Sequence, residues 1–278
     1  MKTKYLLLLF CLFTVACNRQ EDFTMLGEPA SVRDKMNGKV QKVVFKLFWG
    51  TGTGNDITKG NHFTTRERDS LRWFYDFEAT FDNTGDHIIN YNTLDDNNNP
   101  VNTWNFIKEN NLIVLSKWSF RKPGSFGFGS GYPTDGYTKY INNEKGLVIK
   151  KEDRRAHDDS LLYSFTIKYN EPGDEIETQA FDGKGNFFRK WTIEYNDKRQ
   201  AIGGVNYGPD GNIRNSYKNT INDRGKISES TSFDKDKNVI GNAKYTYLEY
   251  DAKGNWIKVG LEYGPFTTYG ERTITYYE

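Results

Sequence analysis

The stretch Phe181-Asp182-Gly183-Lys184-Gly185-Asn186 decides how this chain folds, because close copies of it recur along the sequence. A typical copy runs from an aromatic or branched residue through Asp or Asn to a Gly or a substitute three residues later, then through a polar residue to an apolar one. Asp or Asn can hydrogen-bond nearby backbone, and Gly can take the positive φ that closes a short hairpin with a bulge. The motif therefore predicts a β-hairpin turn. Further copies begin at Phe81, Tyr169, Tyr195, Tyr207, Ile221, Phe233 and Tyr250.

The spacing of the copies predicts the strands between the turns. Their first residues fall at 169, 181, 195, 207, 221 and 233, so steps of 12 and 14 residues alternate and two copies span 26 residues. Side chains alternate between the two faces of a strand, and both steps are even, so apolar residues keep to odd positions from copy to copy. The step from Tyr247 to Tyr250 breaks this parity and predicts a β-bulge or a longer turn.

These patterns predict an all-β fold, an antiparallel meander of repeated β-hairpins over residues 36–278. One repeat cannot bury its apolar face alone, so neighbouring hairpins must stack. The sequence leaves open whether the meander is a curved sheet, a barrel-like wrap or a hairpin coil. Alternation also predicts an early strand over residues 71–81. The charged run 150–159 is interpreted as a solvated connection, and the glycine-rich segment 122–137 as a loop.

The first residues have the pattern of an export signal that ends at a cysteine. Two lysines precede an apolar run over residues 5–15, which is shorter than the roughly 20 apolar residues of a membrane-spanning helix. Residues 14–17 resemble a bacterial lipobox, with the small Ala16 directly before the thiol of Cys17. We therefore predict lipidation of Cys17. The alternative is an ordinary secretory signal that is cut after Ala16, with no role for the cysteine.

This interpretation divides the chain into a signal peptide over residues 1–16, a lipidated tether over 17–35 and the repeat domain. Cys11 would leave with the signal, so Cys17 would be the only thiol of the mature protein. Neither a disulfide nor a cysteine nucleophile would then be available to the repeat domain. The membrane is the one partner that this part of the sequence predicts, and contact with it would be made through the lipid.

The repeats also resemble those of a known family. Units such as Tyr250-Asp251-Ala252-Lys253-Gly254-Asn255 look like the YD repeats of Rhs-type proteins. The chain resembles Rhs-like lipoproteins of Gram-negative bacteria over residues 26–278, most specifically in its opening residues 26–32 and its closing residues 271–277. The resemblance implies a β-repeat scaffold and no particular reaction. The departures from the turn pattern are Arg199 and Lys237 in place of Gly, and Gly208 in place of Asp.

The resemblance also implies a location. Bacteria of this kind use a short acidic signal after the lipidated cysteine to send lipoproteins to the outer face of the outer membrane. Gln20, Glu21 and Asp22 are similar to such a signal, although acidic residues are common near a mature N-terminus. We expect a lipid-anchored outer-membrane protein exposed at the cell surface, with the periplasmic face as the alternative.

The residue types that carry catalysis or bind metals give little support to either activity. Without the two leader lysines the chain has 36 basic and 37 acidic residues, and it contains no basic stretch of the kind that binds nucleic acid. Residues 234–238 open like a calcium loop, but Val239 and Tyr245 stand where an EF-hand needs Gly and Glu. The acidic pairs 95–96 and 158–159 could flank a glycosidic bond, yet turns account for most Asp in this chain. We expect that this chain binds no metal and no cofactor and has no enzymatic activity.

Binding by aromatic side chains is the function that the composition favours. The chain has 6 Trp, 18 Tyr and 19 Phe. Exposed rings beside Asn and Asp suit sugars and also protein surfaces, although aromatic residues are favoured on strands for packing alone. We predict exposed contacts at Trp118, Phe126, Phe128 and Tyr132, for a glycan or protein ligand. Alternative functions are an immunity protein that neutralises a toxin at the envelope, since Rhs-type repeats occur together with toxins, and a structural envelope component.

Overall fold

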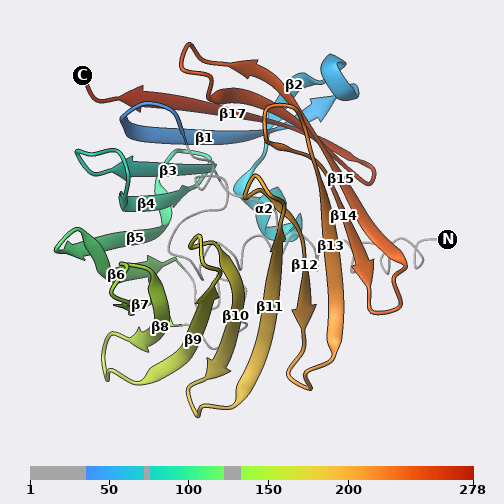
Figure 1. The fold of residues 1–278 in the computed structure, drawn as a ribbon. Helices are drawn as coiled ribbons and strands as arrows, with labels where there is room; N and C mark the ends of the chain where they lie inside the picture. The colour runs from blue at the N-terminus through green and yellow to red at the C-terminus, as the bar shows by residue number, and fades with distance from the viewer. Residues whose placement is uncertain (1–35, 72–75, 122–132) are drawn as a thin grey trace. The chain divides into compact units, whose positions relative to one another are not determined.

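The computed structural model describes residues 36–71, 76–121 and 133–278, and its regular structure is almost entirely antiparallel β (Figure 1). This confirms the predicted all-β meander of hairpins. The leader, the tether with Cys17, and the acidic signal at Gln20, Glu21 and Asp22 lie outside the described residues. The elements are β1 (Val40–Thr51), η1 (Gly54–Asp56), β2 (Thr58–His62), α2 (Thr65–Leu71), β3 (Asp76–Phe81), β4 (Ile88–Leu94), β5 (Pro100–Glu109), β6 (Leu112–Phe120), β7 (Asp135–Asn142), β8 (Val148–Arg155), β9 (Leu161–Tyr169), β10 (Glu175–Asp182), β11 (Phe187–Tyr195), β12 (Ala201–Tyr207), β13 (Ile213–Ile221), β14 (Ile227–Asp234), β15 (Val239–Tyr250), β16 (Trp256–Tyr263) and β17 (Phe266–Tyr276).

The described residues form two compact units, and each unit is built from more than one segment of the chain. The repeats with the most regular spacing fall in the second unit. Unit 1 consists of residues 36–71, 76–105, 119–121 and 243–278. Unit 2 consists of residues 106–118 and 133–242.

In unit 1, strand β1 is the centre of the sheet. It pairs antiparallel with the C-terminal strand β17, where Val43 lies opposite Ile274, and with β3, where Phe45 lies opposite Phe77. The first and last strands of the described chain therefore lie side by side (Figure 1). β2 folds back on β1 through a hairpin that contains the 3-10 turn η1.

A row of aromatic rings crosses the sheet of unit 1. Adjacent ring centroids in the row lie 5.2, 5.4, 5.5 and 5.3 Å apart. Such separations suit offset or edge-on ring pairs, each worth about 0.5–1.5 kcal/mol beyond the burial of its area. We call this row the aromatic ladder. Its members are Phe45 on β1, Phe77 on β3, Tyr91 on β4, Trp104 on β5 and Phe120 on β6.

Unit 2 is the regular part of the meander. Strands β7 to β14 pair in chain order, each antiparallel to the next. On β9, side chains alternate between a buried and an exposed face: Phe165 and Ile167 are buried while Thr166 and Lys168 are exposed. The predicted period-two alternation is therefore confirmed on this strand.

The turns of unit 2 confirm the hairpin motif. In the copy that begins at Phe181, Asp182 Oδ1 accepts hydrogen bonds from the backbone N–H groups of Lys184 and Asn186, each at 2.9 Å. The N–H of Gly185 donates to the carbonyl of Asp182, and Gly185 takes a φ of 83°. Asp and Gly thus have the roles predicted from the sequence.

The three departures from the motif keep the same turn geometry. Arg199 and Lys237 take φ values of 62° and 67°, so they occupy the left-handed conformation that Gly has in the other copies. At Gly208 no turn carboxylate is available, and Asp210 Oδ1 accepts the N–H of Asn212 at 3.0 Å instead. The backbone bonds of the turn are conserved between these copies and the others, which is why the strand register continues through them.

The predicted strand over residues 71–81 is wrong at Leu71 and confirmed over residues 76–81, and residues 72–75 lie outside the described residues. Thr65–Leu71 forms the helix α2, and strand β3 begins at Asp76. The helix begins with a capping box: Thr64 Oγ1 accepts the N–H of Glu67 at 3.2 Å, and Glu67 Oε2 accepts the N–H of Thr64 at 2.8 Å. This Thr-x-x-Glu pattern was present in the sequence and could have predicted the helix.

The interpretation of residues 150–159 as a solvated connection is wrong for residues 150–155, whereas residues 156–159 do form an exposed turn. Residues 148–155 form β8, with Lys151 and Asp153 buried at 0% and 5% exposure. Thr138 Oγ1 donates to Asp153 Oδ1 at 2.7 Å, which compensates the buried carboxylate. The charges hid the alternation because both faces of this strand carry them. The segment predicted as a loop likewise ends earlier, since β7 begins at Asp135.

The break in parity near Tyr247 is a β-bulge, one of the two predicted alternatives. The register between β15 and β16 shifts between Tyr247 and Glu249, and again between Glu249 and Tyr250. An extra residue in one strand changes which face the following side chains occupy.

Candidate functional site

The structure does not support Trp118 as an exposed contact. Its side chain is 4% exposed, so this prediction is wrong. The Trp118 ring lies against the backbone of Gly136, where an added Cβ would come within 2.2 Å of it. Glycine leaves the space that the ring fills, and the ring therefore serves packing in unit 2. The other three predicted contacts, Phe126, Phe128 and Tyr132, lie outside the described residues.

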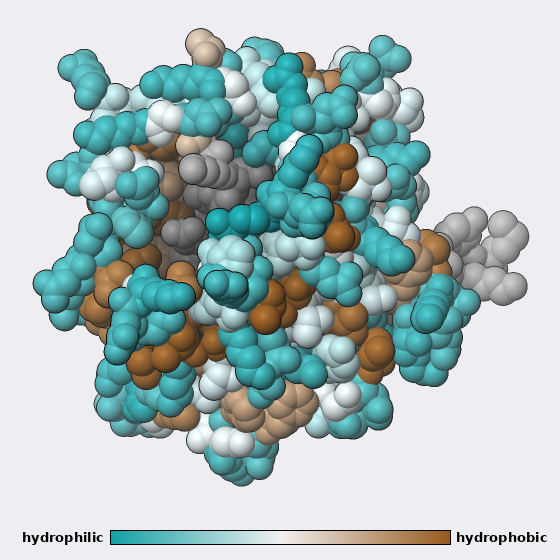
Figure 2. Space-filling view, viewed as in Figure 1, coloured by the Kyte–Doolittle hydropathy of each residue, from teal (hydrophilic) through white to brown (hydrophobic). Residues whose placement is uncertain are grey.

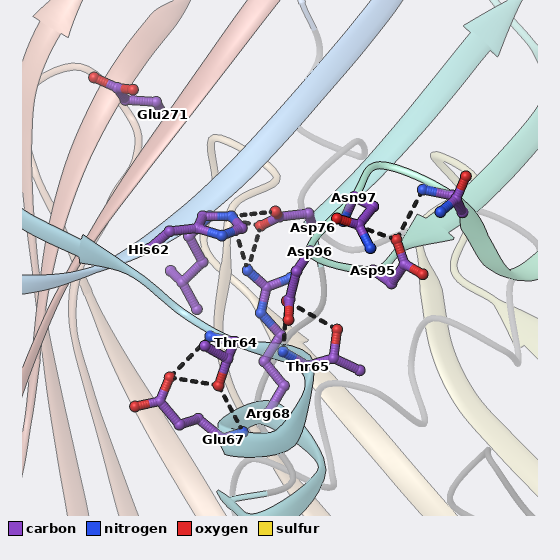
Figure 3. A network of polar contacts seen from close by, with 12 residues as sticks. His62, Thr64, Thr65, Glu67, Arg68, Asp76, Asp95, Asp96, Asn97 and Glu271 are labelled. Carbon is purple, nitrogen blue, oxygen red and sulfur yellow. Dashed lines mark hydrogen bonds and ion pairs between the residues drawn. The ribbon is translucent and has the colours of Figure 1, made fainter.

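A dense polar network surrounds helix α2 in unit 1 (Figure 3). The carboxylate of Asp76 is its centre: Oδ2 lies 2.6 Å from His62 Nε2, and Oδ1 lies 2.8 Å from Arg68 Nη2. The backbone N–H of Leu47 also donates to Oδ1 at 2.8 Å. Trp49 Nε1 donates to Glu67 Oε1 at 3.1 Å. These contacts connect β1, β2, α2 and β3.

The charges of this network compensate one another. The side chains of Arg68 and Asp76 have no exposed area, and the ring of His62 faces Phe48 at a centroid distance of 5.1 Å. Among the described residues, Arg68 Nε and Nη1 have no hydrogen-bond partner. Removing one member of a buried ion pair leaves an uncompensated charge, so such a pair fixes the elements that carry it. We interpret the network as the structural attachment of α2 to the sheet.

The acidic pairs considered for glycoside hydrolysis are used by turns and by the helix. A hydrogen bond from the backbone N–H of Asn99 lowers the pKa of Asp95, and Asp96 accepts the N–H of Thr65 at 2.6 Å. A hydrogen bond from the Ser160 hydroxyl lowers the pKa of Asp158. A glycosidase needs one carboxylic acid whose pKa is raised. The shifts in Asp95 and Asp158 have the opposite direction.

The exposed face of β8 to β10 in unit 2 carries ion pairs. Glu152 lies 2.7 Å from Lys150 and 2.8 Å from Arg154, and Glu177 lies 2.7 Å from Lys168. On the face shown in Figure 2, hydrophilic side chains cover most of the surface and hydrophobic ones form small separate patches. Charges in the middle of strands are typical of a surface in contact with water.

The groove that we take as the candidate binding site lies in unit 2, between two hairpin turns. The β12–β13 turn forms one side and the β14–β15 turn forms the other. One of its lining residues is Ile213, an isoleucine that is 45% exposed. The sequence alone does not reveal this groove, because most of its members are ordinary turn residues. The lining residues are Gly208, Pro209, Asp210, Asn212, Ile213, Arg214, Lys235 and Asp236.

The groove is electrostatically balanced. Asp210 and Asp236 bring two carboxylates, and Arg214 and Lys235 bring two cations. Hydrogen bonds from Asn212, of which the side-chain one has the largest effect, lower the pKa of Asp210, so this carboxylate stays ionised at neutral pH. The site therefore offers donors, acceptors and one exposed apolar side chain without a net charge.

In the described part of the chain, no three His, Cys, Asp or Glu side chains are placed to hold a metal ion. No helix within residues 36–71, 76–121 and 133–278 is long and apolar enough to cross a membrane.

Comparison with known proteins gives structural similarity only. No protein family and no curated protein matches the sequence. A porin-like protein from Bacteroides uniformis has a TM-score of 0.49 at 9% identity, over 86% of this chain and 99% of that one. A porin-like protein from Bacteroides vulgatus has a TM-score of 0.45 at 10% identity, over 86% and 98% of the two chains. The Photorhabdus luminescens Tc holotoxin pore has a TM-score of 0.23 at 12% identity, over 71% and 13%. TM-scores below 0.5 do not establish a shared fold, so the function has to come from the residues of this chain.

Proposed function

We propose that this chain is a lipoprotein of the bacterial envelope that binds a glycan or a protein and catalyses no reaction. The balanced groove beside Ile213 carries the proposal, because it combines exposed apolar area with equal numbers of acidic and basic groups. Glycans and polar protein surfaces offer the complementary mixture of C–H groups, donors and acceptors. A strongly anionic ligand such as nucleic acid would be better matched by a basic excess.

The proposed anchor is a lipid on Cys17, and the proposed location is the outer membrane, with Gln20, Glu21 and Asp22 as the signal for export to its outer face. The ion pairs on the exposed face of β8 to β10 favour a lipid anchor over strands that enter the bilayer. Lys or Arg facing lipid at the bilayer midplane costs about 2–4 kcal/mol each. A lipid-anchored domain whose strands face water avoids this cost.

Binding is tested with the full-length lipoprotein in detergent micelles. The purified protein is applied to a glycan array, and in parallel it is immobilised to capture proteins from an envelope extract. Saturable binding to a glycan or to one envelope protein is expected. Binding in neither assay would contradict the proposed function.

Anchoring is tested by the Cys17→Ala variant. In cells grown with a labelled fatty acid, the unmodified chain is expected to take up label and to fractionate with membranes. The variant is expected to lose the label and to appear in the soluble fraction. Label that persists in Cys17→Ala would refute lipidation at this residue.

A further inference from the structure

The groove is one position in a row that repeats every 26 residues along unit 2. Phe181 lies opposite Phe187 across the β10–β11 turn, and Tyr207 lies opposite Ile213 across the β12–β13 turn. The positions 26 residues after Tyr207 and Ile213 are Phe233 and Val239, which flank the β14–β15 turn. Ile213 is 45% and Val239 63% exposed, so apolar area in this row faces solvent. We call these six side chains the edge row.

The members of the edge row lie at the same end of their strands, beside the turns. Strands β10 to β15 are neighbours in chain order, so every second turn lies at the same end of the strands (Figure 1). Neighbouring strands are 4.7–4.9 Å apart, so equivalent positions two strands away recur at about 10 Å. An extended β-linked glycan repeats every two pyranose rings over a similar length.

Each turn beside the edge row also presents a carboxamide to solvent. Asn186, Asn212 and Asn238 are exposed. Each donates one side-chain N–H to the Asp of its own turn, at 2.9, 3.0 and 3.0 Å. An Asn amide has two N–H donors and an oxygen that can accept, so the turn uses only part of its capacity. The edge therefore alternates apolar area with groups that can bond hydroxyls.

We propose that the edge row binds an extended, uncharged, β-linked glycan that runs across the strands, with about two pyranose rings per pair of strands. The charge balance of Asp210 and Asp236 against Arg214 and Lys235 favours a neutral polymer over an acidic one. The C–H faces of the rings lie on Ile213 and its equivalents, and the hydroxyls bond the turn residues. This inference rests on the proposed function and names its ligand class and site.

The test is a titration of the full-length protein in micelles with neutral β-1,4-linked oligosaccharides of glucose, mannose, xylose and N-acetylglucosamine, two to six rings long. One series is expected to bind, with affinity that rises from two rings to six as further turns are engaged. Ile213→Asp and Val239→Asp are each expected to weaken binding of the six-ring compound about tenfold, because each loses an apolar contact.

Ile141→Asp is the matched control. Ile141 is 43% exposed on β7 of the same unit and lies outside the edge row, so a charge there is expected to leave affinity unchanged. Equal affinities for Ile213→Asp, Ile141→Asp and the unmodified protein would place the bound glycan elsewhere and overturn the site, while the proposed binding function would stand. Binding to an envelope protein but to none of the oligosaccharides would overturn the ligand class alone. Affinity that does not depend on chain length would overturn the proposed course across the strands.

Discussion

The two units of this protein stabilise their sheets in different ways. In unit 1, strands from distant parts of the chain pair around β1, and an aromatic ladder crosses five strands. In unit 2, neighbouring hairpins pair in chain order, and Asp or Asn in the turns fixes their register. The difference indicates that unit 1 depends on ring packing and long-range contacts, whereas unit 2 depends on many small local ones.

The largest expected effect is the loss of stability when a buried tryptophan is replaced, and it can be compared between the two units. Trp104 and Trp191 are 6% and 5% exposed, so replacing either with Ala is expected to lower the free energy of unfolding by about 3–5 kcal/mol. Trp104 also has Tyr91 and Phe120 as ring partners, so its loss is expected to cost about 1–2 kcal/mol more. Urea denaturation followed by circular dichroism measures both. Equal losses would show that the ladder adds nothing beyond burial.

The next largest effect is the loss of stability when an ion pair is broken, which differs between a buried pair in unit 1 and exposed pairs in unit 2. Asp76→Ala would leave the guanidinium of Arg68 buried without its carboxylate, which is expected to cost about 3 kcal/mol. Glu152→Ala in unit 2 breaks pairs on an exposed face, and about 1 kcal/mol or less is expected. Adding Arg68→Met to Asp76→Ala removes the stranded charge and should recover part of the loss. A double variant that is as unstable as the sum of its single variants would argue against direct coupling.

Smaller effects are expected at the two copies of the turn motif in which Arg199 and Lys237 replace glycine. Lys237→Gly relieves a φ of 67° and is expected to stabilise the protein by about 0.5–1 kcal/mol. Arg199→Gly relieves a similar φ but removes an ion pair with Asp174 at 2.7 Å, so little net change is expected. Thermal unfolding of both variants decides this. A stabilisation of the same size in both would mean that the Arg199–Asp174 pair contributes nothing.

The smallest expected effect is the decrease in thermal stability at acidic pH. Side-chain hydrogen bonds from Asn186 and Asn238 are the main cause of the lowered pKa values of Asp182 and Asp234. Because their folded pKa lies below the unfolded value of about 3.9, these carboxylates stabilise the fold above that pH and lose the effect as pH falls through the folded pKa. Tm is therefore expected to fall between about pH 4 and pH 2. Asp234→Asn gives this turn the residue that Asn170 and Asn196 have in theirs, and its Tm is expected to fall less over this pH range. A fall in Tm as large as that of the unmodified protein would refute this cause.

The sequence predicted most of unit 2 and little of the site. The turns and the alternation on β9 follow from local chemistry and from parity, which one sequence contains, and so does the bulge near Tyr247 in unit 1. Helix α2 was missed because its signal is local, a capping box at Thr64 and Glu67, whereas the strand prediction rested on the apolar alternation that begins at Leu71. Trp118 was placed on the surface because burial depends on a partner, Gly136, whose contact only the folded sheet creates. The groove escaped prediction for the same reason: it exists only where two turns meet.

The most direct test is the ratio of two dissociation constants for the same six-ring neutral oligosaccharide. Ile213→Asp and Ile141→Asp place the same charge at equally exposed isoleucines of unit 2, one on the edge row and one outside it. A constant about tenfold larger for Ile213→Asp than for Ile141→Asp is predicted. Equal constants would contradict glycan binding at the turns.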